Sequence, residues 1–334
     1  MANRLDISAL QTVKTLVALA RIRFLGARIP LFFEWNLTFR CNLRCKYCGA
    51  CDAPSDELNT ESVKAGLDGL TTLGTRWVTF GGGEPLLRKD LGEIVQHAKE
   101  KGFQVYLSTN GSLLSKNRGI LEYVDHVNLS LDGPASVHDA VRGKDAFKRT
   151  LEGIAVVRES NASASLQCTL SSLNLEHIEE TVAIAIEQGL PVMFQPATQW
   201  LDSSRKPNPI APEVDAYRET VARLIELKRA GAPIRNSIPG LRHLARWPDA
   251  TPIWCSAGLL TCSIEPDGTM LACHQLEVGR FLKGKAGSGP LPEQFKMLPL
   301  PGGCGQCWCA PIVELALLLS FKPGAVLNAL RMFL

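Results

Sequence analysis

Leu31-Phe-Phe-Glu-Trp-Asn-Leu37, a short apolar run of strand length, is followed after three residues by Cys41-Asn-Leu-Arg-Cys45-Lys-Tyr-Cys48. The run predicts a buried strand, and the loop directly after it carries three thiols. Three thiolates so close together can reach three corners of one iron–sulfur cubane and leave its fourth iron open. An open position lets a metal engage a substrate, as it does at catalytic zinc. We therefore expect chemistry at this loop.

Outward from this stretch, short apolar runs alternate with segments of helical periodicity. The runs that predict parallel strands are residues 31–37, 77–80, 105–108, 126–131, 165–170 and 192–195. The segments of helical periodicity include 60–73, 91–101 and 178–188, which have the length of crossover connections. The predicted fold class is α/β, a partial (β/α)6 TIM-like barrel whose site lies at the carboxyl ends of the strands.

Polar clusters follow the predicted strands. They are Gly82-Gly83-Glu84-Pro85, Ser108-Thr109-Asn110-Gly111, Ser130-Leu-Asp132-Gly-Pro134, and then His138-Asp139 and Arg142. Together with the Cys-x3-Cys-x2-Cys loop and the aromatic Tyr47 before its last cysteine, these motifs resemble the radical S-adenosylmethionine (SAM) superfamily. The resemblance covers about residues 33–200.

The resemblance implies an activity and a set of site residues. Cys41, Cys45 and Cys48 would hold a [4Fe-4S] cluster that reductively cleaves SAM, giving a 5′-deoxyadenosyl radical that abstracts a substrate hydrogen. The implied cofactor-binding residues are Tyr47, Gly82, Gly83, Glu84, Asn110, Ser130, Asp132 and Arg142. In the family pattern the glycine segment binds the SAM amino group, Ser130 and Arg142 hold its carboxylate, and Asp132 lies near the ribose.

A second cysteine-rich region begins near Trp254 and contains a strand-turn-strand signal over residues 263–272. The spacing of Cys255, Gly268 and Cys273 resembles the opening of SPASM and Twitch domains. The resemblance implies one auxiliary [4Fe-4S] cluster, with the ligands Cys255, Cys273, Cys304 and Cys307, and with Cys262 and Cys309 as less certain ligands. We assign Glu265 and Asp267 to the turn between the two strands.

Structural zinc is the alternative at both cysteine regions, because sequence spacing does not report the metal. At the first region, Cys51 would supply a fourth thiolate and close a tetrahedron. Cys51 departs from the three-cysteine pattern, since a fourth thiolate on the open iron would block SAM. It is either a bystander or a redox-active or substrate-facing thiol.

We divide the chain into an apolar and basic helical segment (1–30), the barrel (31–240), the auxiliary cluster domain (250–310) and a helical tail (311–334). The two terminal segments either pack onto the barrel or lie at a membrane interface. The N-terminal stretch has no small-residue cleavage site, so we expect no signal peptide. The core begins near residue 31, which leaves no room before it for an additional peptide-binding domain.

The net charge of +3 gives no broad basic face, so we expect no nucleic-acid partner. The cysteines number eleven, so they cannot all pair in disulfides, and their clustering suits metal ligation in a reducing cytoplasm. The expected substrate is a peptide or protein, as for maturases. The alternatives are a lipid, an isoprenoid or a small metabolite at the membrane surface, and a metal-braced binding module without enzymatic activity. The expected electron donor is flavodoxin or ferredoxin.

Overall fold

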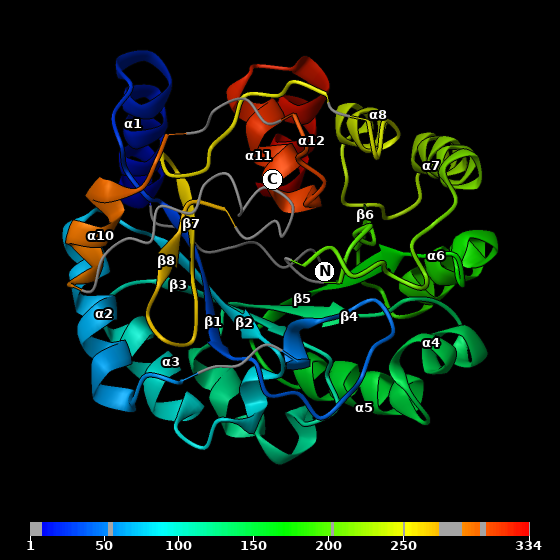
Figure 1. The fold of residues 1–334 in the computed structure, drawn as a ribbon, viewed down its shortest axis with the longest axis horizontal. Helices are drawn as coiled ribbons and strands as arrows, with labels where there is room; N and C mark the ends of the chain where they lie inside the picture. The colour runs from blue at the N-terminus through cyan, green and yellow to red at the C-terminus, as the bar shows by residue number, and fades with distance from the viewer. Residues whose placement is uncertain are drawn as a thin grey trace.

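The computed structural model describes residues 9–52, 56–201, 204–249, 251–273, 289–300 and 305–333. Six parallel strands, each paired with the next in the chain, form most of its sheet (Figure 1). They are β1 (Phe32–Thr38), β2 (Trp77–Gly82), β3 (Gln104–Thr109), β4 (His126–Ser130), β5 (Ser163–Leu170) and β6 (Val192–Pro196). The predicted α/β class and all six predicted strands are confirmed.

The crossover helices cover the outer face of this sheet. They are α2 (Thr60–Thr72), α3 (Leu91–Glu100), α4 (Ala135–Arg142), α5 (Ala146–Arg158) and α6 (Ile178–Glu187). The connections also contain the 3-10 turns η1 (Ala50–Asp52), η2 (Pro85–Leu87), η3 (Leu114–Lys116), η4 (Arg118–Tyr123) and η5 (Leu175–His177). The amide N–H of Ser62 bonds the Asn59 side chain, which caps α2. Val63, Leu67 and Leu70 recur at helical spacing in α2 and are fully buried against the sheet.

The sheet has two more strands than the six expected. β7 (Thr261–Ile264) pairs in parallel with β1, and β8 (Met270–Leu271) returns antiparallel to β7. The order is therefore β6-β5-β4-β3-β2-β1-β7-β8, an open sheet that forms a partial barrel and does not close. The predicted strand-turn-strand over residues 263–272 is thus present, and its first strand extends the main sheet. The short helix α10 (Leu291–Met297) packs against α2.

Beyond β6 the chain forms α7 (Val214–Arg229) and α8 (Ile238–Leu244). Between these helices, Ile234 makes a parallel bridge with Val192, so residues 233–236 run beside β6 like a short additional strand. The side chain of Asn236 accepts from the Phe194 amide at 2.8 Å and donates to the Phe194 carbonyl at 2.9 Å. The segment is therefore held along the β6 edge of the sheet.

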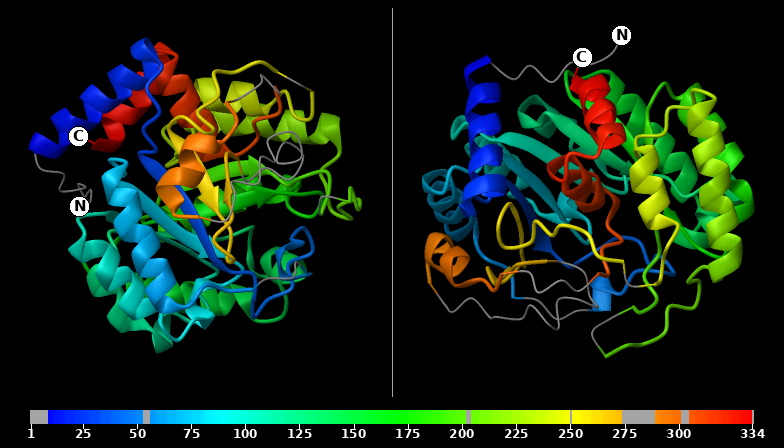
Figure 2. Two further views of the ribbon diagram at one scale, coloured as in Figure 1. Left: turned by 60° about the vertical axis from the view of Figure 1, so that its left-hand side comes forward. Right: turned by 90° about the horizontal axis from the view of Figure 1, so that it is seen from above.

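The terminal helices α1 (Ala9–Leu25), α11 (Ala310–Leu319) and α12 (Pro323–Phe333) lie on one side of the sheet, near the amino-terminal end of β1 (Figures 1 and 2). Ile22 and Leu319 share a buried cluster with Leu31, Trp77 and Leu260. Arg23 Nε donates to the Leu319 carbonyl at 3.0 Å. Both terminal segments thus pack against the core, which is the first of the two alternatives expected for them.

Among the described helices, none is by itself long and apolar enough to cross a membrane. Residues 310–319 and 323–329 pass that test only as a pair, and the two segments are bent by 113° at the break between them.

Candidate active site

The cysteine loop leaves the carboxyl end of β1 and is anchored at both ends. Arg40 N bonds Thr38 Oγ1 at 3.0 Å, and Glu57 accepts from the Arg40 guanidinium at 2.8 and 2.9 Å. Within the loop, Cys48 N donates to the Cys45 carbonyl at 3.0 Å and closes a tight turn. Lys46 N donates to the Val141 carbonyl of α4 at 3.0 Å. The loop is therefore fixed against the ends of two different β/α units.

The glycine segment after β2 lies directly against this loop. Gly83 N donates to Thr38 O at 2.7 Å, and Glu84 N donates to Arg40 O at 2.8 Å. A Cβ on Gly83 would stand 2.3 Å from Arg40 O, and Gly82 has φ +118° with Thr38 O only 2.1 Å from the place of its Cβ. The close approach that requires glycine is thus made by the protein's own backbone.

Glu84 joins this segment to the end of β3. Its fully buried carboxylate accepts from Thr109 Oγ1 at 2.8 Å, from Asn110 N at 2.9 Å and from Leu86 N at 3.2 Å. Burial raises the pKa of Glu84 to about 7, although these donors oppose the rise. The bond from its amide to Glu84 fixes Asn110, whose side chain donates to Asn42 Oδ1 at 3.0 Å and approaches Cys41 Sγ at 4.0 Å.

Tyr47, Asp132 and Arg142 form a buried polar group behind the cysteines. Arg142 Nε donates to Asp132 Oδ2 at 2.6 Å, and Tyr47 OH donates to the same oxygen at 3.0 Å. Arg142 Nη2 also bonds Tyr47 OH, and its Nη1 lies 3.9 Å from Cys45 Sγ. Because Arg142 is the last residue of α4, one helix carries its guanidinium back to the loop at the end of β4.

Asp132 is held from every side. Its Oδ1 accepts from Thr169 N at 2.9 Å, its own amide donates to His138 Nδ1 at 3.1 Å, and its carbonyl accepts from Asn174 Nδ2 at 2.9 Å. Burial lowers the pKa of His138 to about 4, so its imidazole is neutral at pH 7. The carboxylate that neutralises Arg142 therefore has a fixed position.

The four thiols of the loop differ in acidity. Burial raises the pKa of Cys41 to about 11 and raises that of Cys45 as well. A hydrogen bond with Cys51 and burial raise the pKa of Cys48, and the same hydrogen bond lowers the pKa of Cys51 to about 6. Cys51 thus lies beside Cys48, and metal binding at the other three thiols must displace their protons.

The donor set of the loop fits an iron–sulfur cluster. Cys41, Cys45 and Cys48 supply soft thiolate ligands from one loop, while Arg142 and Asn110 direct N–H groups at two of the sulfurs, as donors to cluster sulfurs do. Across the described residues, no three His, Cys, Asp or Glu side chains are grouped tightly enough for a single metal ion. The assignment of the cluster to these three cysteines stays a prediction.

The structure brings most of the predicted cofactor-binding residues together, and Ser130 is the exception. Ser130 ends β4 and pairs with Gln167 of β5. Its hydroxyl makes no hydrogen bond with a described residue and stays outside the Tyr47–Asp132–Arg142 group. Arg142, assigned to the SAM carboxylate, already has Asp132 as a partner. Both SAM assignments stay predictions.

Five of the six auxiliary cysteines lie in the described part of the chain, and Cys304 lies outside it. Cys255, Cys273 and Cys307 are half-buried and pack against the main core, while Cys262 on β7 is buried in it. Burial raises the pKa of Cys262, and Cys273 is near enough to contribute. His243 Nε2 bonds the Cys307 carbonyl at 3.0 Å and ties this region to α8. The ligand assignment stays a prediction.

Sequence reasoning missed two interactions that shape the site. Arg88, which is buried, bonds the Leu37 and Leu58 carbonyls and the Asp90 carboxylate, so it braces the end of β1 from below. The side chain of Glu265 accepts from Asn36 Nδ2 on β1 at 3.2 Å and does more than serve its turn. No sequence signal reports either contact, because both depend on strand pairing.

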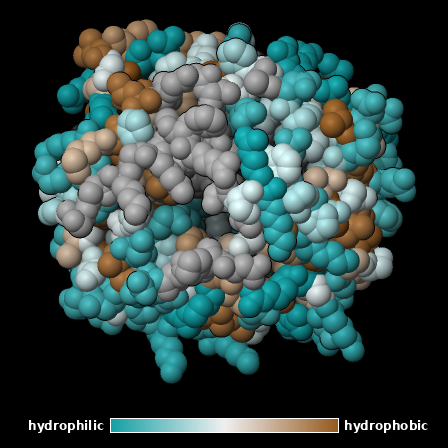
Figure 3. Space-filling model, in the orientation of Figure 1, coloured by the Kyte–Doolittle hydropathy of each residue, from teal (hydrophilic) through white to brown (hydrophobic). Residues whose placement is uncertain are grey.

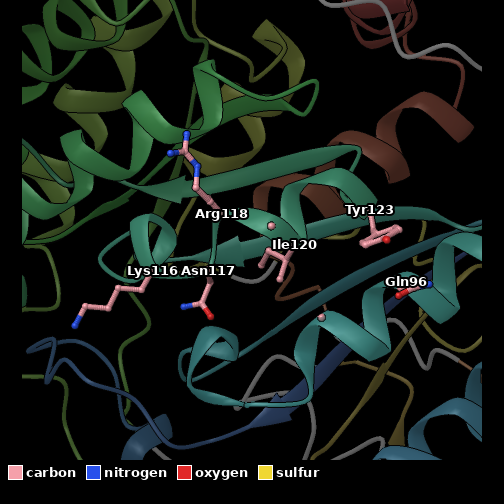
Figure 4. Close-up of a pocket in the computed structure, with 8 residues that line it drawn as sticks. Gln96, Lys116, Asn117, Arg118, Ile120 and Tyr123 are labelled. Atoms are coloured by element: carbon pink, nitrogen blue, oxygen red, sulfur yellow. The ribbon is translucent and has the colours of Figure 1, made fainter.

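A surface hollow lies elsewhere, between α3 and the η3–η4 segment (Figure 4). It is lined by Gly92, Gln96, Lys116, Asn117, Arg118, Gly119, Ile120 and Tyr123. None of these residues belongs to the cysteine loop or to the polar clusters at the strand ends. The hollow is therefore separate from the candidate active site.

Known proteins match the chain over different lengths. The profile of the Radical SAM superfamily matches residues 35–185. An AdoMet-dependent heme synthase from Methanosarcina barkeri is 37% identical over 170 residues, which are 48% of this chain and 48% of that protein. The chain thus spans about half the length of that relative. The mycofactocin maturase MftC of Mycolicibacterium smegmatis is 30% identical over 84% of this chain and 76% of that protein.

Among solved structures, Streptococcus suis SuiB bound to its precursor peptide SuiA superposes with a TM-score of 0.66 at 15% identity. The superposition covers 90% of this chain and 72% of SuiB, and at this identity it reports the fold. Three findings agree with the superfamily profile. They are the partial barrel, the cysteine loop at its strand ends, and the maturase that matches over most of both chains. This chain belongs to the radical SAM superfamily.

Proposed function

We propose that this protein is a radical SAM enzyme that modifies a peptide or protein. The observation that carries the proposal is the contact of Arg142 and Asn110 with the sulfurs of Cys45 and Cys41, because it ties a cluster-type loop to the ends of β3 and β4. With SAM, a [4Fe-4S] cluster on Cys41, Cys45 and Cys48 would supply a 5′-deoxyadenosyl radical that removes a substrate hydrogen. The peptide class is supported by the maturase matched over 84% of this chain.

In this proposal the protein orients the cofactor and excludes water. The Gly82-Gly83 backbone and Arg142 face the cysteine loop, and we assign the SAM amino group to the former and the SAM carboxylate to Arg142 with Ser130. Tyr47 and Asp132 hold the Arg142 guanidinium in place through two hydrogen bonds to one carboxylate oxygen. This buried arrangement strengthens each charge interaction at the site.

An auxiliary [4Fe-4S] cluster on Cys255, Cys273, Cys304 and Cys307 completes the proposal, within a 250–310 domain that follows the 31–240 barrel. Cys262 and Cys309 are the substitutes for any one of these ligands. The attachment of β7 to β1 supports a fixed relation between this region and the cysteine loop. We assign the protein to a reducing compartment, the cytoplasm, where thiolate ligands persist.

The first experiment is anaerobic reconstitution with iron and sulfide, followed by dithionite and SAM. We expect about eight irons per chain and formation of 5′-deoxyadenosine. The matched variants are Cys45→Ala, which removes a proposed ligand, and Cys168→Ala, which removes a buried thiol on the outer face of β5. Cys45→Ala should lose about four irons and all product, and Cys168→Ala should lose neither. Bound zinc without product in the wild type contradicts the proposal.

The second experiment identifies the substrate class through hydrogen transfer. The enzyme is supplied in turn with peptide and lipid fractions from cells grown in deuterated medium. Deuterium appears in 5′-deoxyadenosine only when the fraction contains the substrate. We expect label from the peptide fraction, and label from the lipid fraction alone would replace the peptide assignment.

A lipid, isoprenoid or small-metabolite substrate at a membrane surface is the second candidate, and one observation favours it. Large apolar side chains lie exposed on α1, at the α11–α12 turn and on α12, and hydrophobic surface gathers over α1 (Figure 3). They are Leu16, Val17, Phe24, Leu25, Phe321 and Leu327, each more than half exposed. Residues 7–33 contain four Lys or Arg and no Asp or Glu, which suits an anionic lipid surface. The similar AdoMet-dependent heme synthase is named for a product, heme, that is not a peptide.

Flotation with anionic and with neutral liposomes tests this membrane contact. Phe24 and Phe321 stack at 5.8 Å across α1 and the α11–α12 turn, so Phe24→Glu alters the centre of the face. The matched control is Ile186→Glu, which changes an equally exposed apolar residue on α6. Binding of the wild type and of Ile186→Glu, but not of Phe24→Glu, supports the contact. Flotation of none of the three counts against it.

We assign electron donation to flavodoxin or ferredoxin. Arg44 and Lys46 are exposed on the cysteine loop and give its outer side a positive charge that suits an acidic protein donor. Lys46→Glu should slow reduction by flavodoxin and leave reduction by dithionite unchanged. Equal slowing with both reductants would assign Lys46 to folding of the loop.

A further inference from the structure

The inner face of the sheet is apolar at the amino-terminal ends of β1 and β2, where Phe32 and Trp77 stack in the cluster that contains Leu319, and it is polar farther along the strands. In β1, Phe33, Trp35 and Leu37 pack against the outer helices, so Glu34 and Asn36 face inward by alternation. The same alternation turns a further set of polar side chains inward, namely Thr79, Tyr106, Ser108, His126, Asn128, Ser165 and Gln167. A packed TIM-barrel interior is dominated by branched apolar residues. Beyond the cluster of Phe32 and Trp77, this interior suits a polar ligand instead.

Arg235 reaches this interior from the segment beside β6. Its amide donates to the Val192 carbonyl at 2.8 Å, and its carbonyl accepts from Asn328 Nδ2 of α12 at 3.0 Å. The neighbouring Ile234 packs into the outer core, so Arg235 points to the opposite, inner side. The backbone on which the guanidinium stands is thus fixed from both sides.

One guanidinium nitrogen of Arg235 donates hydrogen bonds to two uncharged side chains. Nη1 donates to Ser165 Oγ at 2.8 Å and to His126 Nε2 at 3.2 Å. Because arginine only donates, His126 Nε2 is the accepting nitrogen, and the proton lies on Nδ1, 2.7 Å from Ser163 Oγ. Burial and the Arg235 charge lower the pKa of His126 to about 3, so the ring is neutral. Neither partner compensates the charge.

No carboxylate in the described part of the chain pairs with Arg235, and its Nε and Nη2 make no hydrogen bond there. Asp125, which acts on the neighbouring Tyr106, is itself held by Lys99 at 2.5 Å and by Val105 N at 2.8 Å. Burial lowers the pKa of Arg235, the opposite of the direction at Arg142, whose charge Asp132 neutralises. An inward-facing guanidinium without a counter-charge is costly and favours an anion.

We propose that Arg235, supported by His126 and Ser165, binds a carboxylate group of the substrate inside the barrel. The inference rests on the proposed function, since it assigns a subsite to that substrate. The Nε and Nη2 edge of arginine is suited to bidentate binding of a carboxylate. Ser165 precedes Gln167, the partner of Ser130, by two residues, about 7 Å along β5. A carboxylate on Arg235 would therefore lie at least two residues below the carboxyl ends of the strands.

The test measures binding of small carboxylates to the reconstituted full-length protein by thermal shift. The probes are N-acetyl-aspartate amide, which mimics an acidic side chain, N-acetylglycine, which mimics a chain terminus, and neutral N-acetyl-asparagine amide. We expect one or both carboxylates to raise Tm, and the neutral probe to have no effect. The stronger carboxylate identifies the source of the group.

The variants are Arg235→Gln, Arg235→Lys and the exposed control Arg118→Gln. In Arg235→Gln the apparent Kd for the better probe should rise about tenfold or more, with a smaller rise in Arg235→Lys and none in the control. If Arg235→Gln fails to fold, the apparent Kd of Arg235→Lys and the preference of the wild type for charged over neutral probes still test the subsite. Equal Tm shifts with charged and neutral probes, or equal Kd in the wild type and the Arg235 variants, overturn the subsite. Formation of 5′-deoxyadenosine by the wild type is scored separately, and its absence counts against the proposed function alone.

Discussion

Arg142 and Asp132 form a buried ion pair at 2.6 Å, and Tyr47 donates to the same carboxylate oxygen. The pair joins the end of α4 to the loop after β4, directly behind Cys45. Removing one member of a buried pair leaves an uncompensated charge, whereas exposed pairs contribute little. The pair therefore stabilises the fold only while both members are present.

Asp132→Ala should lower the free energy of unfolding by about 3–5 kcal/mol. The control is Glu159→Gln, which breaks the exposed Arg118–Glu159 pair and should cost less than about 1 kcal/mol. Urea unfolding followed by circular dichroism measures both. A loss of similar size in the two variants would mean that Asp132 and Arg142 do not depend on one another.

Glu84 should make stability decrease as pH rises. Its folded pKa is raised from 4.5 to about 7, so between these values the folded chain keeps a proton that the unfolded chain has released. The free energy of unfolding should fall by roughly 3 kcal/mol across this window. The lowered pKa values of His126 and His138 act in the opposite direction, so the wild type is compared with Glu84→Gln.

The measurement is urea unfolding of both proteins at several pH values from 4.5 to 7.5. As pH rises, the free energy of unfolding of Glu84→Gln should increase steadily relative to that of the wild type. A difference that stays constant with pH would place the Glu84 pKa near its ordinary value.

Gly83→Ala should damage the site through the backbone. The added Cβ would stand 2.3 Å from Arg40 O and 2.6 Å from Phe39 O, and neither atom can move without shifting the cysteine loop. We expect a loss of about 1–3 kcal/mol and weaker cluster assembly. Gly119→Ala is the matched control, because a Cβ there meets nothing within 4 Å. Iron content and Tm report both effects, and equal values in the two variants would contradict the prediction.

Cys51→Ser separates a cluster from a four-thiolate zinc site. Cys51 bonds Cys48, but the cluster assignment needs only Cys41, Cys45 and Cys48. We expect Cys51→Ser to retain the iron that Cys48→Ser loses, as measured by iron analysis and the visible absorption spectrum. Loss of metal in both variants would make Cys51 a ligand.

The strands and the site loops could be predicted from sequence because each is a local signal. Apolar runs of strand length end in Gly or Ser at Gly82, Ser108 and Ser130, and parallel strands bring such ends together. Arg142 and Asp132 were both expected at the site, but with separate roles. Their pairing depends on the length of α4, which turns Arg142 back toward the loop.

Contacts between distant parts of the sheet could not be predicted. The parallel register of Phe32 with Thr261 joins strands more than two hundred residues apart, and nothing in either run specifies the partner. Arg235 illustrates the same limit. Its segment looks like a polar linker in the sequence, and only pairing with Val192 turns its side chain inward.

The pairing of β7 with β1 has a consequence for shortening the chain. β1 is an interior strand only because β7 covers one of its edges, from Phe32 to Trp35. A truncation after residue 250 would bare that row of backbone N–H and C=O groups on an apolar strand, which is a template for intermolecular pairing. Residues 1–250 expressed alone should therefore aggregate. The cysteine-rich region thus also protects this edge of β1 from pairing with another molecule.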